Sequence, residues 1–576
     1  MSISTLLRRL SRGSRTSSRS SRRGPARSYR PRLEALETRQ LLSSFIVVLT
    51  TDNGGQTGQR VTATAGDLRY CIEQADALHS ATTDTISFSP TVFGTPQTIT
   101  LNSTTRELVL NDSHPLSILG PSADTVTVSG GDAVEVLDVI SGTVSISHLA
   151  VSHGNSPVDG GGINNHGTLT LTDCTLDHDR ATSEGGGLAN GPRGSGGTAT
   201  LVRCTFNHDS AGDSGGGILT FNTLTAIDCT FSNDSASAVG GGIFAVGTLT
   251  LTNCNLGNDS AADLGGGVYI HVHSTATFTN CTLSNDSATS AGGDGGGVFV
   301  NDQSTATFTN CTLSNDSAGN GGGGICTDGS GAVTLANCTL SNDSARQGGG
   351  VCVVSGGTLT ATNSTFNNDV NSGVLNEGTA TVAACTFSDD SALDGGGMEN
   401  TSTATLTNCT FSNNSTTSNG NGGGIWNAGG ATIAVTNCTI ANNSAVNGSG
   451  GGIWNAGGGT LILTNTIVAE NTAAVSGPDI SGNVNTADHN LIGNGSGMSI
   501  VTDQGGNLIG GNGNPVIDPR LGPLQNNGGP TQTLALLKDS PAIGHADNSR
   551  APATDQRGFT RADESGETTD IGAFEL

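Results

Sequence analysis

The stretch GTLTLTNCNLGNDSAADLGGGV, residues 247–268, decides the fold of this chain. Its first part alternates threonine with leucine, and this period of two predicts a β-strand with an apolar inner face and a hydroxyl-bearing outer face. Asn253 interrupts the alternation. We expect a bend there, because asparagine tolerates the left-handed backbone conformation.

Two further strands complete the predicted unit. Cys254 and Leu256 continue the apolar face on a second short strand, and residues 258–260 suit the next turn. The glycine triplet 265–267 precedes Val268, which begins a third strand. Glycine fits positions that need unusual dihedral angles or a close approach between backbones.

The unit recurs about a dozen times between residues 160 and 470, at spacings of 21 to 30 residues. Repeats of this length are typical of a solenoid, in which each coil stacks on the one before. The usual hand of parallel crossovers makes the winding right-handed. We therefore predict an all-β, right-handed parallel β-helix (solenoid) with a short N-terminal helical cap and an irregular C-terminal domain. Ten cysteines mark the repeat: Cys174, Cys204, Cys229, Cys254, Cys281, Cys311, Cys338, Cys385, Cys409 and Cys438.

Composition and charge restrict the possible functions. Apolar residues make up 34% of the chain and aromatic residues 3%, while glycine contributes 87 of the 576 residues. Residues 1–32 contain ten arginines and no acidic residue, so the remainder holds 13 basic and 49 acidic residues. Such an acidic body repels nucleic acid and anionic membranes. The longest apolar run, residues 45–49, is far shorter than the ~20 residues of a membrane-spanning helix, so we predict no transmembrane segment.

Four segments are expected along the chain. A helix over residues 67–79 would have Asp67 near its N-cap and Leu68, Cys71, Ile72, Ala75 and Leu78 on one face. Such a helix can cover the first coil of a solenoid. The predicted segments are a basic targeting segment, expected to be disordered (1–44), the N-terminal cap with this helix (45–83), the β-helix (84–511) and the C-terminal domain (512–576).

Several motifs resemble those of bacterial surface proteins. Residues 32–43 resemble the short Leu-Glu-x-Arg-x-Leu-Leu-Ser element that opens many of them, and residues 66–75 resemble a module found before many bacterial β-helices. Residues 507–576, with Asp518-Pro519-Arg520 and Asp570-Ile571-Gly572 among their motifs, resemble the choice-of-anchor Q domain. This resemblance implies display on a bacterial cell surface.

The repeats are also similar to those of the polymorphic outer-membrane protein family. Residues 411–414, FSNN, and residues 423–425, GGI, are near matches to its two marks. The chain has glycine where that family has alanine, and leucine often replaces its phenylalanine.

A row of aspartates is the first candidate binding feature. One interpretation is a Ca²⁺ ladder, because stacked carboxylates repel one another and a cation would relieve them. The other is that these residues suit a turn and face water, and it is favoured because Asn414 and Asn443 take the same place without charge. We predict no cofactor, with Ca²⁺ as the one candidate, and the metal-site residues stay open. The row consists of Asp179, Asp209, Asp234, Asp259, Asp286, Asp316 and Asp343.

Two other repeated positions have packing and binding interpretations. The cysteines are expected to be reduced core residues rather than disulfides, since Ser364 and Thr466 replace them in register. Cys326 and Cys352 form a second pair with the same two interpretations. The outward threonines, such as Thr248, would form a flat hydroxyl array that serves as a solvent-facing strand surface or docks glycans.

Catalysis has little support in the sequence. Polysaccharide lyases and hydrolases occur on β-helix folds, but a fold does not establish a function. Arginines are sparse between residues 160 and 470, and the early histidines show no metal-ligand spacing, so we assign no catalytic or cofactor-binding residue and predict no enzyme. These side chains are Arg180, Arg193, Arg203 and Arg346, and His148, His153, His166, His178 and His208.

The sequence thus favours a secreted or cell-surface structural, adhesin-like protein of bacterial origin. Its repeated polar faces would bind weakly and multivalently to cell-wall or extracellular glycans or to surface proteins, without nucleic acid. The alternatives are a carbohydrate-active enzyme, either a polysaccharide lyase or a hydrolase, and a calcium-dependent adhesin. A groove with a break in the ladder, clustered carboxylates and a nearby arginine would favour the enzyme.

Overall fold

The computed structural model describes residues 43–52, 58–78, 83–104, 106–111, 114–122, 125–191, 196–561 and 568–576. Apart from residues 43 and 44, the predicted targeting segment lies outside this part of the chain, as does Arg193. The described residues belong to one compact unit.

One regular coil contains four short strands. They are β26 (Thr248–Thr252), β27 (Asn255–Gly257), β28 (Ser260–Ala261) and β29 (Val268–Ile270). Three of them correspond to the predicted strands. The fourth, β28, includes Ser260, which was predicted to lie in a turn and instead pairs with Ser287 of the next coil.

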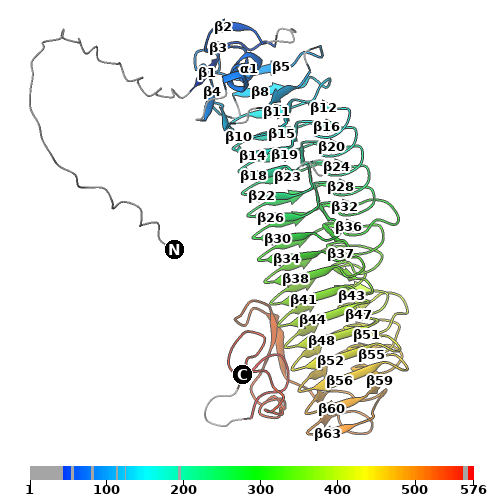
Figure 1. Cartoon of the computed structure of the whole chain (residues 1–576). Helices are drawn as coiled ribbons and strands as arrows, with labels where there is room; N and C mark the ends of the chain where they lie inside the picture. Colours follow the sequence, from blue (N-terminus) through cyan, green and yellow to red (C-terminus); the bar gives the residue numbers. More distant parts are fainter. Residues whose placement is uncertain are drawn as a thin grey trace, which may run out of the picture. The chain divides into compact units, whose positions relative to one another are not determined.

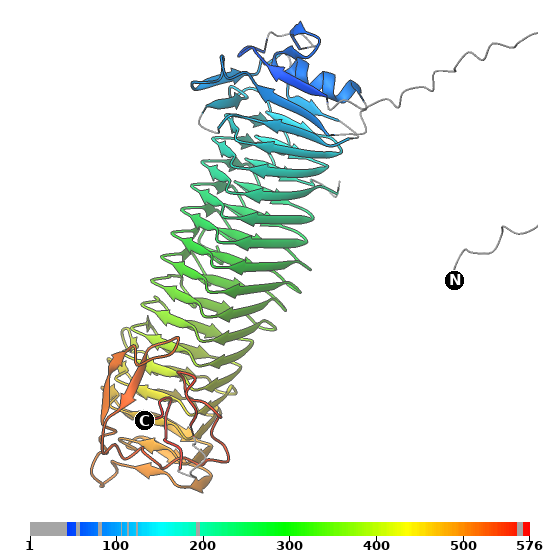
Figure 2. The same ribbon diagram turned by 90° about the vertical axis from the view of Figure 1, so that its left-hand side faces the viewer.

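The coils stack in register, so that like strands form parallel sheets along a rod (Figures 1 and 2). Sheet A runs from β1 (Ser44–Val47), which pairs with β4 (Asp84–Phe88), to β63 (Asp503–Gly505). Sheet B runs from β5 (Gln97–Thr100) to β64 (Leu508–Ile509). Thr250, for example, pairs with Thr225 of one neighbouring coil and Thr277 of the other. The predicted parallel β-solenoid is confirmed.

Sheet C forms the third long face and carries the candidate sites. Sheet D is shorter and consists of seven strands, beginning with β12 (Asn155–Ser156), and a separate set of four. The 16 strands of sheet C are β6 (Leu108–Leu110), β9 (Leu137–Val139), β13 (Ile163–Asn165), β17 (Leu188–Asn190), β21 (Ile218–Thr220), β25 (Ile243–Ala245), β29, β33 (Val298–Val300), β37 (Ile325–Thr327), β40 (Val351–Val353), β43 (Val374–Asn376), β47 (Met398–Asn400), β51 (Ile425–Asn427), β55 (Ile453–Asn455), β59 (Ile480–Val484) and β62 (Met498–Ile500).

A continuous apolar core fills the inside of the coils. It extends from Phe45 to Ile492 and includes Leu249 and Leu251 of β26. Burial of each leucine of this kind contributes about 2 kcal/mol. Stacking also aligns rings of successive coils, and the centroids of Phe278 and Phe308 lie 4.4 Å apart. The interior is therefore a set of vertical side-chain ladders.

Asparagines in the left-handed conformation make the corners of the coil. Asn253 has φ 54° at the bend between β26 and β27, as predicted, and Asn258 has φ 60° at the following bend. The first glycine of the triplet, Gly265, has φ 64°. The other two have no positive φ but lie against the next coil, so the triplet combines both predicted roles of glycine.

The cysteine column lies inside the core. All thirteen cysteines are buried free thiols, which agrees with the predicted packing role. Ser364 occupies the column where one cysteine is missing, and its hydroxyl accepts a hydrogen bond from the amide of Cys338 (3.1 Å) and donates one to the carbonyl of Thr362 (2.9 Å). A hydroxyl can therefore replace the thiol at the same place.

A short helix covers the first coil. Helix α1 spans Leu68–Leu78, close to the predicted bounds, and the Asp67 carboxylate caps it by accepting the amide hydrogen of Tyr70 (2.8 Å). Arg69 pairs with Asp52 (3.0 Å) and donates to the carbonyl of Glu107 (2.8 Å). Among the described residues, no helix is both long and apolar enough to cross a membrane.

The C-terminal residues pack against the outside of sheet B, beside the later coils (Figures 1 and 2). They include an antiparallel pair, β65 (Leu521–Gln525) and β66 (Thr533–Leu536). Gln556 donates to Thr386 (2.9 Å) and accepts from Thr410 (2.7 Å), and both threonines are fully buried. The segment thus covers outward positions that are partly exposed in earlier coils.

Candidate functional site

The outward-facing residues at the centres of the sheet C strands form one column along the rod. Its middle part, from Ala189 to Leu375, is apolar and buried beneath the adjoining loops. Its two ends differ, because the first coils carry Val109, Asp138 and Asn164 at this position and the later coils carry Glu399, Trp426 and Trp454. Among the described residues, the charged side chains of this column therefore lie only at its two ends.

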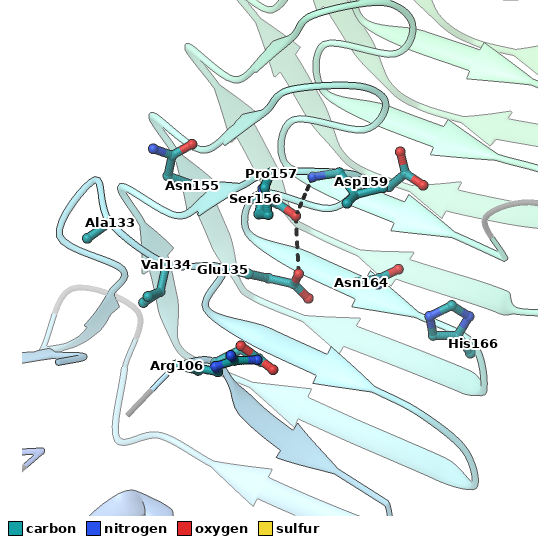
Figure 3. A pocket seen from close by; sticks show the side chains of 12 residues that line it. Arg106, Ala133, Val134, Glu135, Asn155, Ser156, Pro157, Asp159, Asn164 and His166 are labelled. Atoms are coloured by element: carbon teal, nitrogen blue, oxygen red, sulfur yellow. Dashed lines mark hydrogen bonds between the residues drawn. The ribbon is translucent and has the colours of Figure 1, made fainter. Parts of the chain in front are cut away.

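The polar N-terminal end contains a pocket of about 750 Å³ (Figure 3). Such a volume lies within the usual range for ligand sites. Arg106, Glu107, Glu135, Asp159 and His166 are among its lining residues. Sheet D begins only at β12, at the edge of this pocket, so the first coils leave an opening that the later coils close.

Glu135 is the most perturbed group of the pocket. Its Oε2 accepts a hydrogen bond from the hydroxyl of Ser156 (3.3 Å), while its buried Oε1 has no hydrogen-bond partner (Figure 3). Burial raises the pKa of Glu135 to about 9, and the negative charges of Asp138 and Glu107 act in the same direction. Glu135 is therefore protonated at neutral pH and can donate a proton or a hydrogen bond.

The groups around Glu135 include both acidic and basic side chains. Burial also raises the pKa of Asp138, although His166, 4.0 Å away, opposes this shift. A protonated carboxyl group beside other carboxylates can hydrogen-bond to sugar hydroxyls or act as a general acid. The guanidinium group of Arg106 supplies a positive charge. The pocket thus brings several carboxylates together with an arginine, although the strands of sheet C pair without a break beside it.

The other end of the column carries the only two tryptophans of the chain. Trp426 and Trp454 occupy paired positions in adjacent strands, and their rings stack with centroids 5.6 Å apart. Glu399 pairs with Trp426 on the other side. Burial raises the pKa of Glu399 to about 7, with Asp394 and Glu377 adding negative charge. This end offers an aromatic and acidic surface.

The aspartate row lies inside the molecule, and the prediction that it faces water is wrong. Asp259, for example, is fully buried, and its Oδ1 accepts the amide hydrogen of Asp234 in the preceding coil (2.8 Å). The physical cause is the residue before it, since Asn258 in the left-handed conformation turns the next side chain inward. The row therefore presents no carboxylate to a cation in solution. We call this row the buried aspartate column.

The column contains nine aspartates, two more than the sequence analysis identified. Asp369 and Asp390 follow Ser364 and Cys385 by five residues, as Asp259 follows Cys254, and this constant offset could have revealed them. In each member, Oδ1 accepts a backbone amide hydrogen from the preceding coil, and Oδ2 has no hydrogen-bond partner. The nine are Asp179, Asp209, Asp234, Asp259, Asp286, Asp316, Asp343, Asp369 and Asp390.

Three asparagines, Asn414, Asn443 and Asn471, continue the column and show which hydrogen bonds a side chain forms at this position. Asn443 accepts the amide hydrogen of Asn414 through Oδ1 (2.9 Å), as the aspartates do, and its Nδ2 donates to the carbonyl of Phe411 (3.0 Å). Asn471 makes the equivalent contacts. A protonated aspartate has the same shape and also has one donor. Burial raises the pKa of Asp259 to about 8, and protonation removes the repulsion between neighbouring carboxylates in the column.

The structure shows how three of the early histidines lie relative to one another. His153, His178 and His208 are 25 and 30 residues apart, which appeared unsuited to shared ligation. One coil of the solenoid has this length, so their rings lie in one stack. His148 and His166 lie elsewhere and contact Asp173 (3.5 Å) and Asp138, respectively.

Sequence comparison assigns this architecture to a known family. The model of the right-handed β-helix region matches residues 159–340, 266–440 and 350–514, which together exceed half of the chain. The chain belongs to the right-handed β-helix family. The predicted hand of the winding is thereby confirmed. No curated protein matches this β-helix in sequence.

Proposed function

We propose that this β-helix is a secreted or cell-surface, adhesin-like rod that binds extracellular glycans weakly and at many points. The outer face of sheet A carries the proposal, because its threonines form continuous rows. In β26 the outward residues are Thr248, Thr250 and Thr252, and the first of them is exposed. Thr248 pairs with Thr275, which in turn pairs with Thr305.

The spacing of these rows suits a polymeric ligand. Hydroxyl groups recur at the interstrand distance of roughly 4.8 Å, so one glycan chain can contact several coils. Each contact is weak, and their combination gives useful affinity through multivalency. The acidic character of the chain favours neutral or cationic glycans over anionic ones.

The C-terminal segment supports the proposed location. Its resemblance to the choice-of-anchor Q domain suggests display on a bacterial surface. It packs against the coils, since the buried Arg561 donates a hydrogen bond to Asn408 (2.9 Å). Within the segment, Arg561 pairs with Glu575 (3.0 Å). A rod joined to such a segment would project its threonine rows away from the point of attachment.

Lysines in the exposed threonine row are expected to weaken multivalent binding strongly. The triple variant Thr248→Lys/Thr275→Lys/Thr305→Lys should reduce binding on a glycan array at least tenfold, because bulky charged groups separate the ligand from the sheet. The control is the triple variant Ser237→Lys/Asp263→Lys/Thr289→Lys, which places three lysines at exposed loop positions of the same region. Both variants are made in the full chain and compared with the parent. Absence of glycan binding by the parent, or an equal loss in the control, would reject the proposal.

The pocket favours a second function, that of a carbohydrate-active enzyme. Glu135 would act as the general acid, with Asp138 or Asp159 as the partner carboxylate. Glu135→Gln keeps the size of the side chain but removes the proton, so turnover of a polysaccharide substrate should fall about 100-fold or more. Activity of the parent should also decline as the pH rises through about 9, where Glu135 loses its proton.

A matched variant separates catalysis from folding. Asp263→Asn removes one exposed carboxylate far from the pocket in sequence and should leave turnover unchanged. Reducing-end and unsaturated-product assays on a panel of neutral and acidic polysaccharides measure hydrolase and lyase activity. No turnover by the parent chain on the whole panel would exclude this second function.

A further inference from the structure

A row of histidines lies on an exposed corner of the β-helix. His153, His178 and His208 occupy equivalent positions in three successive coils, at the bend that follows a strand of sheet B. Their imidazole rings stack, with centroid distances of 5.4 Å between the first two and 4.8 Å between the last two. Each has a positive φ, between 50° and 58°.

An aspartate completes this cluster. Asp177 Oδ2 lies 2.9 Å from Nδ1 of His178, while Oδ1 accepts a hydrogen bond from the side-chain Nδ2 of Asn207 (2.8 Å). Asn207 thus holds the carboxylate in place. Ligand atoms of Asp177, His178 and His208 all lie within 4.8 Å of one another.

The fold itself does not require histidine at this corner. The following coils place Asn233 and Asn258 at the same position, with φ 58° and 60°. Asparagine adopts the left-handed conformation more readily than most residues. The imidazole rings therefore supply nitrogen donor atoms, which the bend itself does not need.

We propose that His178, His208 and Asp177 bind a divalent transition-metal ion such as Zn²⁺, Ni²⁺ or Cu²⁺. Two imidazole nitrogens and one carboxylate oxygen form a donor set that such ions prefer over Ca²⁺ or Mg²⁺. About half of the His178 side chain is exposed (51%), so a rotation about its side-chain bonds can direct a ring nitrogen toward the shared ion. His153, the next member of the stack, is placed to supply a further ligand.

A second acidic and histidine-containing cluster provides a contrast. Asp488, His489 and Asp547 also bring three ligand atoms together. There, however, the guanidinium group of Arg550 lies 3.0 Å from Asp488 and 3.6 Å from Asp547, and a fixed positive charge opposes a bound cation. Among the described residues, the proposed site has no arginine contact of this kind.

Isothermal titration calorimetry of the full chain with Zn²⁺ tests the proposal. The parent should bind one ion per chain at this site, and His178→Asn/His208→Asn should lower the affinity at least tenfold. Asparagine suits the backbone at both positions, so the variant should keep the parent's circular dichroism and melting temperature. The variant His489→Asn serves as the control and should leave the Zn²⁺ affinity unchanged.

A gain of binding gives an independent test. Asn233→His extends the histidine stack by one coil and should raise the affinity or the number of ions bound. Unchanged Zn²⁺ binding after loss of both histidines, or absence of binding by the parent at millimolar Zn²⁺, would overturn the proposal. Loss of binding in the His489→Asn variant alone would also overturn it, because it would place the ion at the other cluster.

Discussion

Raising the pH from 4 to 8 is expected to lower the free energy of unfolding of this β-helix by at least about 5 kcal/mol. The cause is the buried aspartate column. Burial raises the folded-state pKa of Asp259 and of Asp343 to about 8, and it raises the pKa of the other members well above the usual value. Unfolding exposes these groups to water, where their pKa is about 3.9.

The sign follows from the number of bound protons. Below about pH 4 both states bind these protons, so the column imposes no penalty on folding. Between pH 4 and 8 the folded state retains protons that the unfolded state releases, and each such group lowers the stability by about 1.4 kcal/mol per pH unit. The stability contribution is therefore present in acid and lost as the pH rises through the folded-state pKa.

A single substitution isolates the effect of one group. Asp259→Asn should flatten the dependence of stability on pH by about 1.4 kcal/mol per unit between pH 4 and 8 and should make the chain more stable than the parent at pH 8. Asn443 shows that an asparagine side chain satisfies both hydrogen bonds in this column. Asp263→Asn, in the same coil but exposed, should change neither the slope nor the midpoint.

Chemical denaturation of the full chain, followed by circular dichroism from pH 4 to 9, measures these differences. A denaturation midpoint that is constant or rises between pH 4 and 8 would show that the column is ionised in the folded state. The protonated column also means that the formal charge of −26 overstates the negative charge of the folded chain at neutral pH.

The strands and bends could be predicted from the sequence because each is set by a local rule. Alternation of threonine and leucine in residues 248–252 determines which side chains point inward. Asn253 determines the bend, because its conformation is rare for other residue types. Stacking then repeats the same local structure in every coil, so a correct prediction for one repeat extends to the others.

The orientation of Asp259 could not be judged by the same local rule. Aspartate is common in exposed turns, and its charge argues against burial. The structure reverses this expectation because the preceding left-handed residue directs the side chain inward and the third glycine of each triplet leaves room for it. A Cβ at Gly242 would lie only 2.7 Å from Oδ2 of Asp259.

The pocket was beyond prediction for a different reason. Arg106, Glu135 and Asp159 come from the early coils, where the repeat is irregular and no register relates one residue to another. The histidine row was missed although its register is regular. Neighbours in a solenoid are one whole coil apart, so spacings of 25 and 30 residues do not form a local motif in the sequence.

Replacing the middle glycine of one triplet is expected to cause a large loss of stability. Gly266→Ala should lower the free energy of unfolding by about 3 kcal/mol or more. A Cβ at this position would lie 2.3 Å from the backbone nitrogen of Ser287 and 2.4 Å from the carbonyl oxygen of Gly296. Both atoms belong to the next coil, so neither can move without disturbing the hydrogen bonds between coils.

Gly457→Ala is the matched control, since a Cβ there meets no atom within 4 Å and its φ is not positive. This variant should unfold within about 0.5 kcal/mol of the parent. Denaturant titration of both variants at pH 5, where the aspartate column is protonated, compares them without interference from ionisation. If Gly266→Ala were as stable as Gly457→Ala, the coils could not be packed as closely at the triplets as the structure has them, and the burial of the aspartate column beneath those glycines would fail with it.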